Sequence, residues 1–323
     1  MSVRIKNIEY YLPEQIIRNA DLAKEFPEWE AEKIEEKVGI RMRHVVSKDE
    51  TALDLAYMAG EKLLTQIDRN TIDFLILCTQ SPDYFLPTSA CILQDKLKLR
   101  KNIGAFDFNL GCSGYVYGLG IAKGLINSNI ANRILLITSE TYSKHIHRSD
   151  KGSRSIFGDG AAATLIEKSE EEGIHEFVFG TDGSGMNNLI VKRGGMRFEQ
   201  TDNYSNPDNC LYMNGPEIFN FTLDVIPDLV KKTLELNKLK SEEIDYYIFH
   251  QANKFMLDYL RKKLKVDPGI FYNNLLSTGN TVSSTIPIAI KDCLDNNLIK
   301  SKNKVMIAGF GVGYSWGASV ITI

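Results

Sequence analysis

Residues 70–80, NTIDFLILCTQ, and residues 241–251, SEEIDYYIFHQ, follow one pattern. Each places Ile-Asp before a short apolar run that ends in a polar pair, and a run of this length and composition predicts a buried β-strand. About 60 residues further on, each stretch is followed by a second such run, NRILLITSE at 132–140 and NKVMIAGFG at 303–311. Glycine- and alanine-rich turns then lead into further predicted strands at 157–169 and 314–323. The chain therefore contains an internal repeat.

Helical periodicity fills the intervals between these strands. Residues 52–67, ALDLAYMAGEKLLTQI, and residues 216–236, PEIFNFTLDVIPDLVKKTLEL, both predict helices. Strand, helix and strand recurring in the same order predict an α/β protein of two similar halves, each with a largely parallel sheet that is buried on both faces. The charged stretch EKSEEEG at 167–173 favours a boundary there, with halves at 1–170 and 171–323.

Composition narrows the class of function. The 323 residues are 43% hydrophobic and 24% charged, as in an ordinary globular protein, and the net charge of −3 disfavours binding to a nucleic-acid backbone. No apolar run approaches the ~20 residues that span a bilayer and the first residues lack the features of a signal peptide, so we expect a cytoplasmic protein. The five cysteines include no Cys-x-x-Cys pair and no zinc-ligand spacing, which predicts reduced thiols and no metal site.

One cysteine differs from the others in its surroundings. Residues 109–120, NLGCSGYVYGLG, place Cys112 between a predicted strand and a helix whose apolar residues and glycines are typical of close burial. Because unpaired N–H groups and the helix dipole stabilise a thiolate at a helix N-terminus, we expect a lowered pKa and a nucleophilic role for Cys112. The alternative is a buried structural cysteine, which is the interpretation we adopt for Cys78, Cys91, Cys210 and Cys293.

His250 and Asn280 occupy positions in the sequence that suit a catalytic role. His250 ends the apolar run YYIF and precedes a predicted helix, at the carboxyl end of a strand, where open α/β sheets expose functional groups. Further along, LLSTGNTVSSTIPIAI places Asn280 in a glycine-led turn ahead of hydroxyl residues that suit the cap of the next helix. Taken alone, each of these residues would more often be structural than catalytic.

Three motifs taken together change that interpretation. NLGCSG around Cys112, HQAN from His250 and GNTVSS from Gly279 resemble the Cys–His–Asn constellation of β-ketoacyl-acyl-carrier-protein synthase III, a condensing enzyme of the thiolase superfamily. Four further stretches resemble this family in the expected order: YLPEQIIRNADL at 11–22, GIRMRH at 39–44, SIFGDGAAA at 155–163 and GFGVGYSWGAS at 309–319. The resemblance spans almost the whole chain.

The resemblance implies a fold and a reaction. The fold would be the five-layered αβαβα thiolase arrangement of two duplicated halves, which brings Cys112 of the first half to His250 and Asn280 of the second. The reaction would be a decarboxylating Claisen condensation, in which Cys112 takes an acyl group from acyl-coenzyme A and a carrier-bound malonyl group then loses carbon dioxide. His250 and Asn280 would stabilise the resulting enolate, and the backbone N–H groups of Cys112 and Val312 would form the oxyanion hole. No metal or other cofactor is implied.

The resemblance also assigns roles to outlying residues. Positions along the acyl and pantetheine tunnel would be Phe157, Leu189, Met213, Phe219 and Asn253, with Leu86 closing the acyl pocket from the partner of a homodimer. The coenzyme A nucleotide would lie at Lys151 and Trp29, and an acyl-carrier protein would dock on Lys254, Arg261, Lys262 and Lys263. Because Leu86 is smaller than the phenylalanine of some relatives, we expect a primer longer or more branched than acetyl.

Other interpretations fit the sequence less well. GYSWG at 313–317 matches the G-x-S-x-G of serine hydrolases, but a predicted strand follows it and no histidine does. GFGVGY and GDGAAA do not open a helix after a first strand, as a dinucleotide fingerprint requires. Two alternatives stay open: an acyltransferase or condensing enzyme of secondary or surface-glycan metabolism, and a non-catalytic carrier-binding partner. The second would be expected to lose the three residues that this chain retains.

Overall fold

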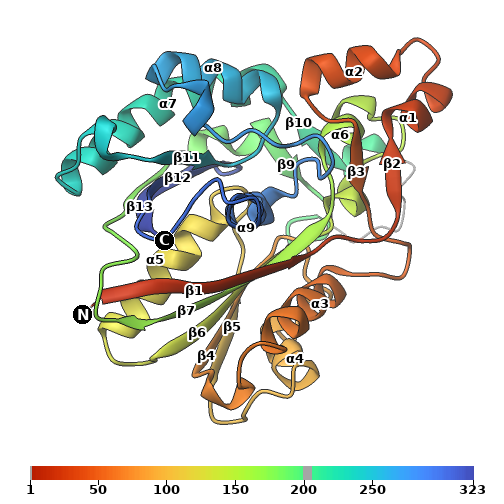
Figure 1. Ribbon diagram of the computed structural model, residues 1–323. Coiled ribbons are helices and arrows are strands. Elements are labelled where there is room, and N and C mark those ends of the chain that lie inside the picture. The colour runs from red at the N-terminus through yellow and green to blue at the C-terminus, as the bar shows by residue number, and fades with distance from the viewer. Residues whose placement is uncertain (1, 199–205) are drawn as a thin grey trace.

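The first half of the chain forms a five-stranded sheet. The computed structural model describes residues 2–198 and 206–323 (Figure 1). The strands lie in the order β1 (Ser2–Tyr11), β7 (Gly160–Ser169), β6 (Arg133–Glu140), β4 (Phe74–Cys78) and β5 (Gly104–Phe108). β6, β4 and β5 run parallel to one another, whereas β7 pairs antiparallel with both β6 and β1.

The second half repeats this arrangement. Its four strands lie in the order β11 (Tyr246–Phe249), β12 (Lys304–Gly311), β13 (Ser315–Thr322) and β8 (Val178–Thr181). β11 and β12 are parallel, and β13 pairs antiparallel with β12 and β8, so these four strands correspond in order and direction to β4, β6, β7 and β1. A parallel bridge between Tyr247 and Phe271 occupies the place of β5. The predicted internal repeat is confirmed.

Both sheets mix parallel and antiparallel strand pairs, whereas the sequence predicts largely parallel sheets. Among the described residues, the two sheets contain three parallel and four antiparallel strand pairs. The antiparallel pairs arise where β7 and β13, the strands that follow the glycine- and alanine-rich turns, return alongside β6 and β12. A strand that is covered on both faces is a continuous apolar run in either direction, so its composition does not reveal that reversal.

Helices complete five layers. α3 (Ala52–Leu64) and α4 (Ser89–Lys96) cover the outer face of the first sheet, and α7 (Gly215–Leu236) and α8 (Lys254–Leu264) cover the outer face of the second (Figure 1). α5 (Gly114–Asn127) and α9 (Thr285–Asp295), one from each half, lie between the two sheets. The order of layers is therefore αβαβα, which confirms the fold implied by the resemblance.

Smaller elements gather at one end of this layered core (Figure 1). They are β2 (Ile16–Arg18), β3 (Met42–His44), α1 (Asn19–Glu25), α2 (Ala31–Val38), α6 (Lys151–Ile156), β9 (Leu189–Val191) and β10 (Leu211–Met213). None of the helices in the part of the chain described here is long and apolar enough to cross a bilayer. The five cysteines form no disulfide in this structure.

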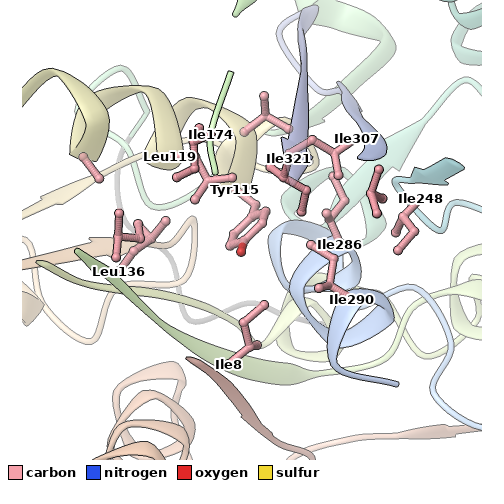
Figure 2. Packing of buried hydrophobic residues seen from close by; sticks show 14 of the residues in the cluster. Ile8, Tyr115, Leu119, Leu136, Ile174, Ile248, Ile286, Ile290, Ile307 and Ile321 are labelled. Atoms are coloured by element: carbon pink, nitrogen blue, oxygen red, sulfur yellow. The ribbon is translucent and has the colours of Figure 1, made fainter. Parts of the chain in front are cut away.

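The core between the sheets explains why α5 and α9 are apolar on most sides. Figure 2 shows Tyr115 and Leu119 of α5 and Ile286 of α9 packed against residues of both sheets. The sheet residues in this cluster include Ile8, Leu136, Ile248, Ile307 and Ile321. A Cβ at Gly118 would lie 2.8 Å from Leu136 Cδ1, so α5 can approach the first sheet only with glycine there. This close packing fixes where the N-terminal end of α5 lies, and Cys112 is just before it.

Candidate active site

Cys112, His250 and Asn280 line one cavity of about 110 Å³. All three side chains are almost fully buried, at 6%, 2% and 4% exposure. Cys112 lies in the turn after β5, His250 at the end of β11 and Asn280 in the turn before α9. Both halves of the chain therefore contribute residues to the cavity. The convergence predicted from the motifs is confirmed. The other residues around the cavity are Ile156, Phe157, Leu189, Met213, Gly215, Ile218, Thr222, Ala252, Asn253, Met256, Phe310 and Gly311.

Cys112 lies against the main chain of β12. A Cβ at Gly311 would be 2.9 Å from the Cys112 sulfur, so only glycine lets this strand pass so close. The backbone N–H groups of Cys112 and Val312 both lower the pKa of the thiol, which places them on the side of the sulfur. These are the two donors expected to form the oxyanion hole, and they come from different halves of the chain.

The expected lowering of the Cys112 pKa is wrong. Burial, followed by the negative charge of nearby Glu140, raises the pKa of Cys112 to about 12, and the N–H groups of Cys112 and Val312 only partly oppose this. Residue 112 also precedes the N-cap of α5, which is Ser113, so the helix begins two residues after the thiol. In this closed site the loss of hydration outweighs the helix terminus. A thiolate therefore requires a proton acceptor.

His250 is a neutral imidazole whose tautomer is set by its neighbours. Burial lowers its pKa to about 3, against a weaker raising effect of the Val282 carbonyl. Its Nδ1 lies 2.7 Å from the hydroxyl oxygen of Thr285, and that hydroxyl donates to the Val282 carbonyl at 3.0 Å. The hydroxyl has a single proton, so Nδ1 carries the proton of the imidazole and donates to Thr285. Nε2 is then left as an acceptor on the side of the cavity.

Asn280 presents its amide group as a donor. Its side-chain oxygen accepts from the Val282 N–H at 2.9 Å, and its Nδ2 donates to the Ala252 carbonyl at 3.4 Å. This fixes which way the carboxamide faces and leaves one N–H for the cavity. The main chain of Asn280 is held as well, because its N–H donates to the Ile156 carbonyl at 2.9 Å and its carbonyl accepts from Gly158 at 3.0 Å.

A buried carboxyl group that the sequence did not single out lies behind the thiol. Burial raises the pKa of Glu140 to about 8, and several hydrogen bonds oppose that shift. Its two oxygens accept from the Gln80 N–H at 3.1 Å, from the Ser81 hydroxyl at 3.2 Å and from the Ser283 hydroxyl at 3.0 Å. Glu140 and Gln80 belong to the first half and Ser283 to the second, so this cluster ties the two halves together next to Cys112.

The predicted tunnel residues fall into two groups. Phe157, Leu189, Met213 and Asn253 line the cavity, and the Asn253 side chain also caps α8 by accepting from Met256 N at 2.9 Å. Phe219 is not among the lining residues: its ring is stacked on Phe255 with centroids 5.2 Å apart. Leu86 is 84% exposed and does not line the cavity of its own chain.

Tyr142 adds to this set. It is buried in one apolar cluster with Cys112, Phe157 and Leu189, and its ring lies 5.3 Å from that of Phe157. Its hydroxyl donates to the side-chain oxygen of Gln80. No sequence motif marked this tyrosine, because an aromatic residue after a strand is ordinarily core.

The two predicted nucleotide residues lie together. The Lys151 ammonium is 5.2 Å from the centre of the Trp29 ring and 2.5 Å from a Glu28 carboxylate oxygen. Trp29 lines a pocket of about 370 Å³ between α2 and α6, which also includes Gly152, the neighbour of Lys151, and shares Ile156 with the cavity of Cys112. The structure therefore brings these residues to a second opening beside the catalytic cavity.

The predicted basic cluster divides between two surfaces. Lys254 and Lys262 line a groove between α8 and α2 of about 420 Å³, together with Lys33, Lys37 and the exposed ring of Phe255. The other two basic residues turn elsewhere: Lys263 donates to the Leu223 carbonyl at 2.7 Å, and Arg261 donates to the Val266 carbonyl at 3.1 Å. Within residues 2–198 and 206–323, no group of acidic, histidine and cysteine side chains is placed to hold a metal ion.

A buried thiol that faces an imidazole and a carboxamide across two duplicated halves defines an acyl-transferring enzyme of the thiolase fold. The comparisons then give the family. Residues 106–183 match the family described as 3-Oxoacyl-[acyl-carrier-protein (ACP)] synthase III, and residues 234–323 match its C-terminal part. The chain is 38% identical over 316 residues to the beta-ketoacyl-[acyl-carrier-protein] synthase III of Clostridium perfringens strain 13, with 97% of each chain covered. The protein therefore belongs to the 3-oxoacyl-acyl-carrier-protein synthase III family and is an acyltransferase.

Solved structures agree with this assignment. A crystal structure of a 3-oxoacyl-(acyl-carrier-protein) synthase III is 46% identical, with a TM-score of 0.97 and all of both chains covered. The 3-oxoacyl-(acyl-carrier protein) synthase from Burkholderia xenovorans LB400 is 35% identical, with a TM-score of 0.93 over 100% of this chain and 94% of that one. OleA from Xanthomonas campestris is 16% identical with a TM-score of 0.86, which shows a shared fold alone.

Proposed function

We propose that the protein catalyses the decarboxylating Claisen condensation of an acyl-coenzyme A primer with malonyl-acyl-carrier protein. The product is a 3-oxoacyl-carrier protein, the first intermediate in building a fatty acid. The observation that carries this proposal is the convergence of Cys112, His250 and Asn280 on one buried cavity. The family assignment supports the carrier-bound substrate, because the relatives are named as synthases of that product.

The first stage transfers the acyl group to Cys112. The thiol proton passes to Nε2 of His250, the ring nitrogen left as an acceptor, and the sulfur attacks the thioester carbonyl of the primer. The N–H groups at Cys112 and Val312 stabilise the negative oxygen of the tetrahedral intermediate. Collapse breaks the carbon–sulfur bond of the primer, and the departing thiolate of coenzyme A takes the proton back from His250.

The second stage forms the carbon–carbon bond. The malonyl carboxylate leaves as carbon dioxide, and its bonding electrons produce an enolate whose charge lies on the thioester oxygen. Asn280 Nδ2 donates to that oxygen, and so does His250 in its other neutral tautomer, which forms when Nε2 gains a proton from solvent and Nδ1 loses its proton to solvent. The enolate carbon attacks the acyl carbonyl, Cys112 leaves as a thiolate, and that thiolate regains a proton from solvent. These steps use side chains and main-chain donors, so we propose no cofactor.

The surroundings of the cavity suit the two substrates. We assign the pantetheine arm to the side lined by Met213 and Asn253, and the coenzyme A nucleotide to the neighbouring pocket beside Trp29 and Lys151. Lys254 and Lys262 in the groove along α8 supply positive charge for an acidic carrier protein.

A homodimer would complete the acyl side of the site. Leu86 is 84% exposed, and its neighbours Tyr84 and Phe85 are 60% and 62% exposed. Three exposed apolar side chains in one loop suit contact with a second copy of the chain. In that arrangement Leu86 closes the partner's acyl pocket, and its modest size leaves room for a primer longer or more branched than acetyl.

Acylation of the protein tests the proposal. The protein is incubated with acyl-coenzyme A donors of two to eight carbons, straight and branched, and the added mass is located by peptide mapping. We expect the acyl group on Cys112, and its loss as a 3-oxoacyl product when malonyl-carrier protein is added. Strict preference for acetyl would reject the larger primer alone. Acylation of another residue, or none, would reject the proposed function.

A further inference from the structure

Ser315 belongs to the GYSWG motif, which matches a serine-hydrolase signature that nothing else in the chain supports. Its side chain is 4% exposed, at the start of β13. The Ser315 hydroxyl donates to the Val312 carbonyl at 2.9 Å, and its oxygen lies 2.6 Å from the hydroxyl oxygen of Ser113. Because its single proton goes to Val312, the Ser113 hydroxyl must be the donor of the second bond. A continuous chain therefore runs from Ser113 through Ser315 to Val312.

Ser113 departs from the usual behaviour of a serine in its position. It is the N-cap of α5, where a serine side chain normally accepts from a backbone N–H of the first turn. Here the side chain makes no capping hydrogen bond. It is fully buried and turns to Ser315 in the other half of the chain. The backbone of Ser113 is in the αR conformation, which does not place its side chain for capping and leaves the hydroxyl to bond Ser315.

The chain of hydroxyls joins the two loops that carry the oxyanion donors. Ser113 directly follows Cys112, and Val312 is the residue whose carbonyl Ser315 holds. The end of β12 also packs closely on the Cys112 loop: a Cβ at Gly309 would lie 2.7 Å from the Cys112 carbonyl oxygen, and a Cβ at Gly111 would lie 2.8 Å from Val312 Cγ1. These packing contacts have no preferred direction, whereas a hydrogen bond sets both a distance and an angle between the two segments.

We propose that Ser113 and Ser315 are positioning residues that align the backbone N–H groups of Cys112 and Val312 on one oxyanion. Neither hydroxyl touches the reacting atoms. They act through the two loops, one from each half of the chain, and so keep the two donors at a fixed separation. The role of the oxyanion hole rests on the proposed function, whereas the alignment of the two N–H groups on the Cys112 sulfur does not.

Single substitutions can test the hydrogen bond between Ser113 and Ser315. Ser315→Ala and Ser113→Ala each remove it, and Ser315→Thr keeps the hydroxyl. Ser319→Ala is the matched control, since Ser319 is also buried in β13 but its single hydroxyl proton is directed to the carbonyls of residues 175, 176 and 320, at 3.1–3.2 Å, and not to Ser113 or Val312. Misalignment of one oxyanion donor is expected to lower kcat by roughly tenfold to a hundredfold with little change in KM. Thermal unfolding identifies any variant that has lost its fold.

Two spectroscopic and chemical readouts separate alignment from simple damage. In the enzyme acylated with carbonyl-labelled acetyl, hydrogen bonds from the oxyanion hole lower the carbonyl stretching frequency, so Ser315→Ala should raise that frequency and Ser315→Thr should restore it. The second readout needs no acyl donor. The rate at which iodoacetamide alkylates Cys112 at pH 9 should fall in Ser315→Ala and Ser113→Ala and stay unchanged in Ser319→Ala, because the N–H groups favour the thiolate.

The possible results either support or overturn the proposed role of Ser113 and Ser315. Reduced alkylation together with a raised carbonyl frequency supports the inference. An unchanged alkylation rate and an unchanged frequency in folded Ser315→Ala overturn it, even if turnover is slower. If the native protein takes no acyl group from any donor, the proposed function fails, and the alkylation rates still decide whether the two serines align the donors.

Discussion

The Nδ1 atom of His250 lies 2.7 Å from the hydroxyl oxygen of Thr285. The Thr285 hydroxyl donates its hydrogen bond to the Val282 carbonyl, so it accepts from Nδ1 of His250. The resting imidazole is therefore protonated at Nδ1, and Nε2 is an acceptor. The same hydroxyl can rotate and donate to Nδ1 once the proton has moved to Nε2. One threonine therefore suits both protonation patterns that the two stages require.

Replacing Thr285 tests that relationship. Thr285→Val removes a hydrogen bond worth about 1 kcal/mol, so we expect turnover to fall roughly fivefold to tenfold. The ¹⁵N chemical shifts of the His250 ring should show a mixture of tautomers in place of one. Thr285→Ser keeps the hydroxyl and should behave as the native protein does. A single tautomer in Thr285→Val would show that other contacts set it.

Replacing Asn280 should separate the two stages. Asn280→Ala removes an enolate donor, and the loss of one such donor typically lowers the rate by about 10²–10³-fold. Decarboxylation should fall by that amount, while acylation of Cys112 stays within about threefold of the native rate, a difference of less than 1 kcal/mol in the barrier. Stopped-flow acylation and release of labelled carbon dioxide measure the two stages. An equal loss in both would mean that Asn280 acts by holding the site together.

The charge of Glu140 should govern the reactivity of Cys112 in alkaline solution. Above its pKa of about 8, Glu140 is negative and disfavours the thiolate. Glu140→Gln removes that charge, so alkylation of Cys112 at pH 9 to 10 should be faster than in the native protein. Asp159→Asn is the control, because Asp159 is also fully buried but is not among the groups that shift the Cys112 pKa. Slower alkylation in Glu140→Gln would contradict this account.

Glu140 should also make stability depend on pH. Its pKa is about 8 in the fold against an ordinary 4.5, so between these values the folded protein binds more protons than the unfolded chain. The contribution of Glu140 is therefore fully present below about pH 4.5 and is lost as pH rises to about 8, on the order of a few kcal/mol. Urea unfolding of the native protein and Glu140→Gln across this range checks the sign. A slope that persists unchanged in Glu140→Gln would assign it to other groups.

Reversing the charge of lysines on α8 should identify the surface on which the carrier protein docks. Lys254→Glu with Lys262→Glu removes positive charge from the groove along α8, so KM for malonyl-carrier protein should rise and its dependence on salt should weaken. Lys263→Glu serves as the comparison on the same helix, since the Lys263 ammonium is directed to the Leu223 carbonyl of α7. A larger effect at Lys263 would move the docking surface to the α7 side.

Much of the fold could be predicted because the repeated stretches of sequence are apolar runs that form β-strands. The runs at 70–80 and 241–251 became β4 and β11, and the later pair became β6 and β12 with the same parallel partners. What could not be predicted is the direction of β7 and β13, since a strand buried on both faces has the same composition in either direction.

The sequence motifs identify the residues of the candidate site, but the chemistry of the site depends on how the fold surrounds them. Cys112, His250 and Asn280 each follow a recognisable turn or strand end, which is why sequence could name them. The direction of the Cys112 pKa shift could not be predicted, because it depends on how completely the thiol is removed from water and on Glu140, which is far from Cys112 in sequence and near it in the fold. Thr285 gave no signal in the sequence, and Ser315 gave only a misleading match to a hydrolase motif, since the role of a buried hydroxyl depends on its hydrogen-bond partners.

A single-turnover experiment tests the central claim most directly. Protein carrying acetyl on Cys112 is mixed with malonyl-carrier protein labelled in the carboxyl group. We predict one labelled carbon dioxide for each 3-oxoacyl-carrier protein formed, and neither product from Cys112→Ala. Loss of the acetyl group from Cys112 without release of carbon dioxide would contradict it.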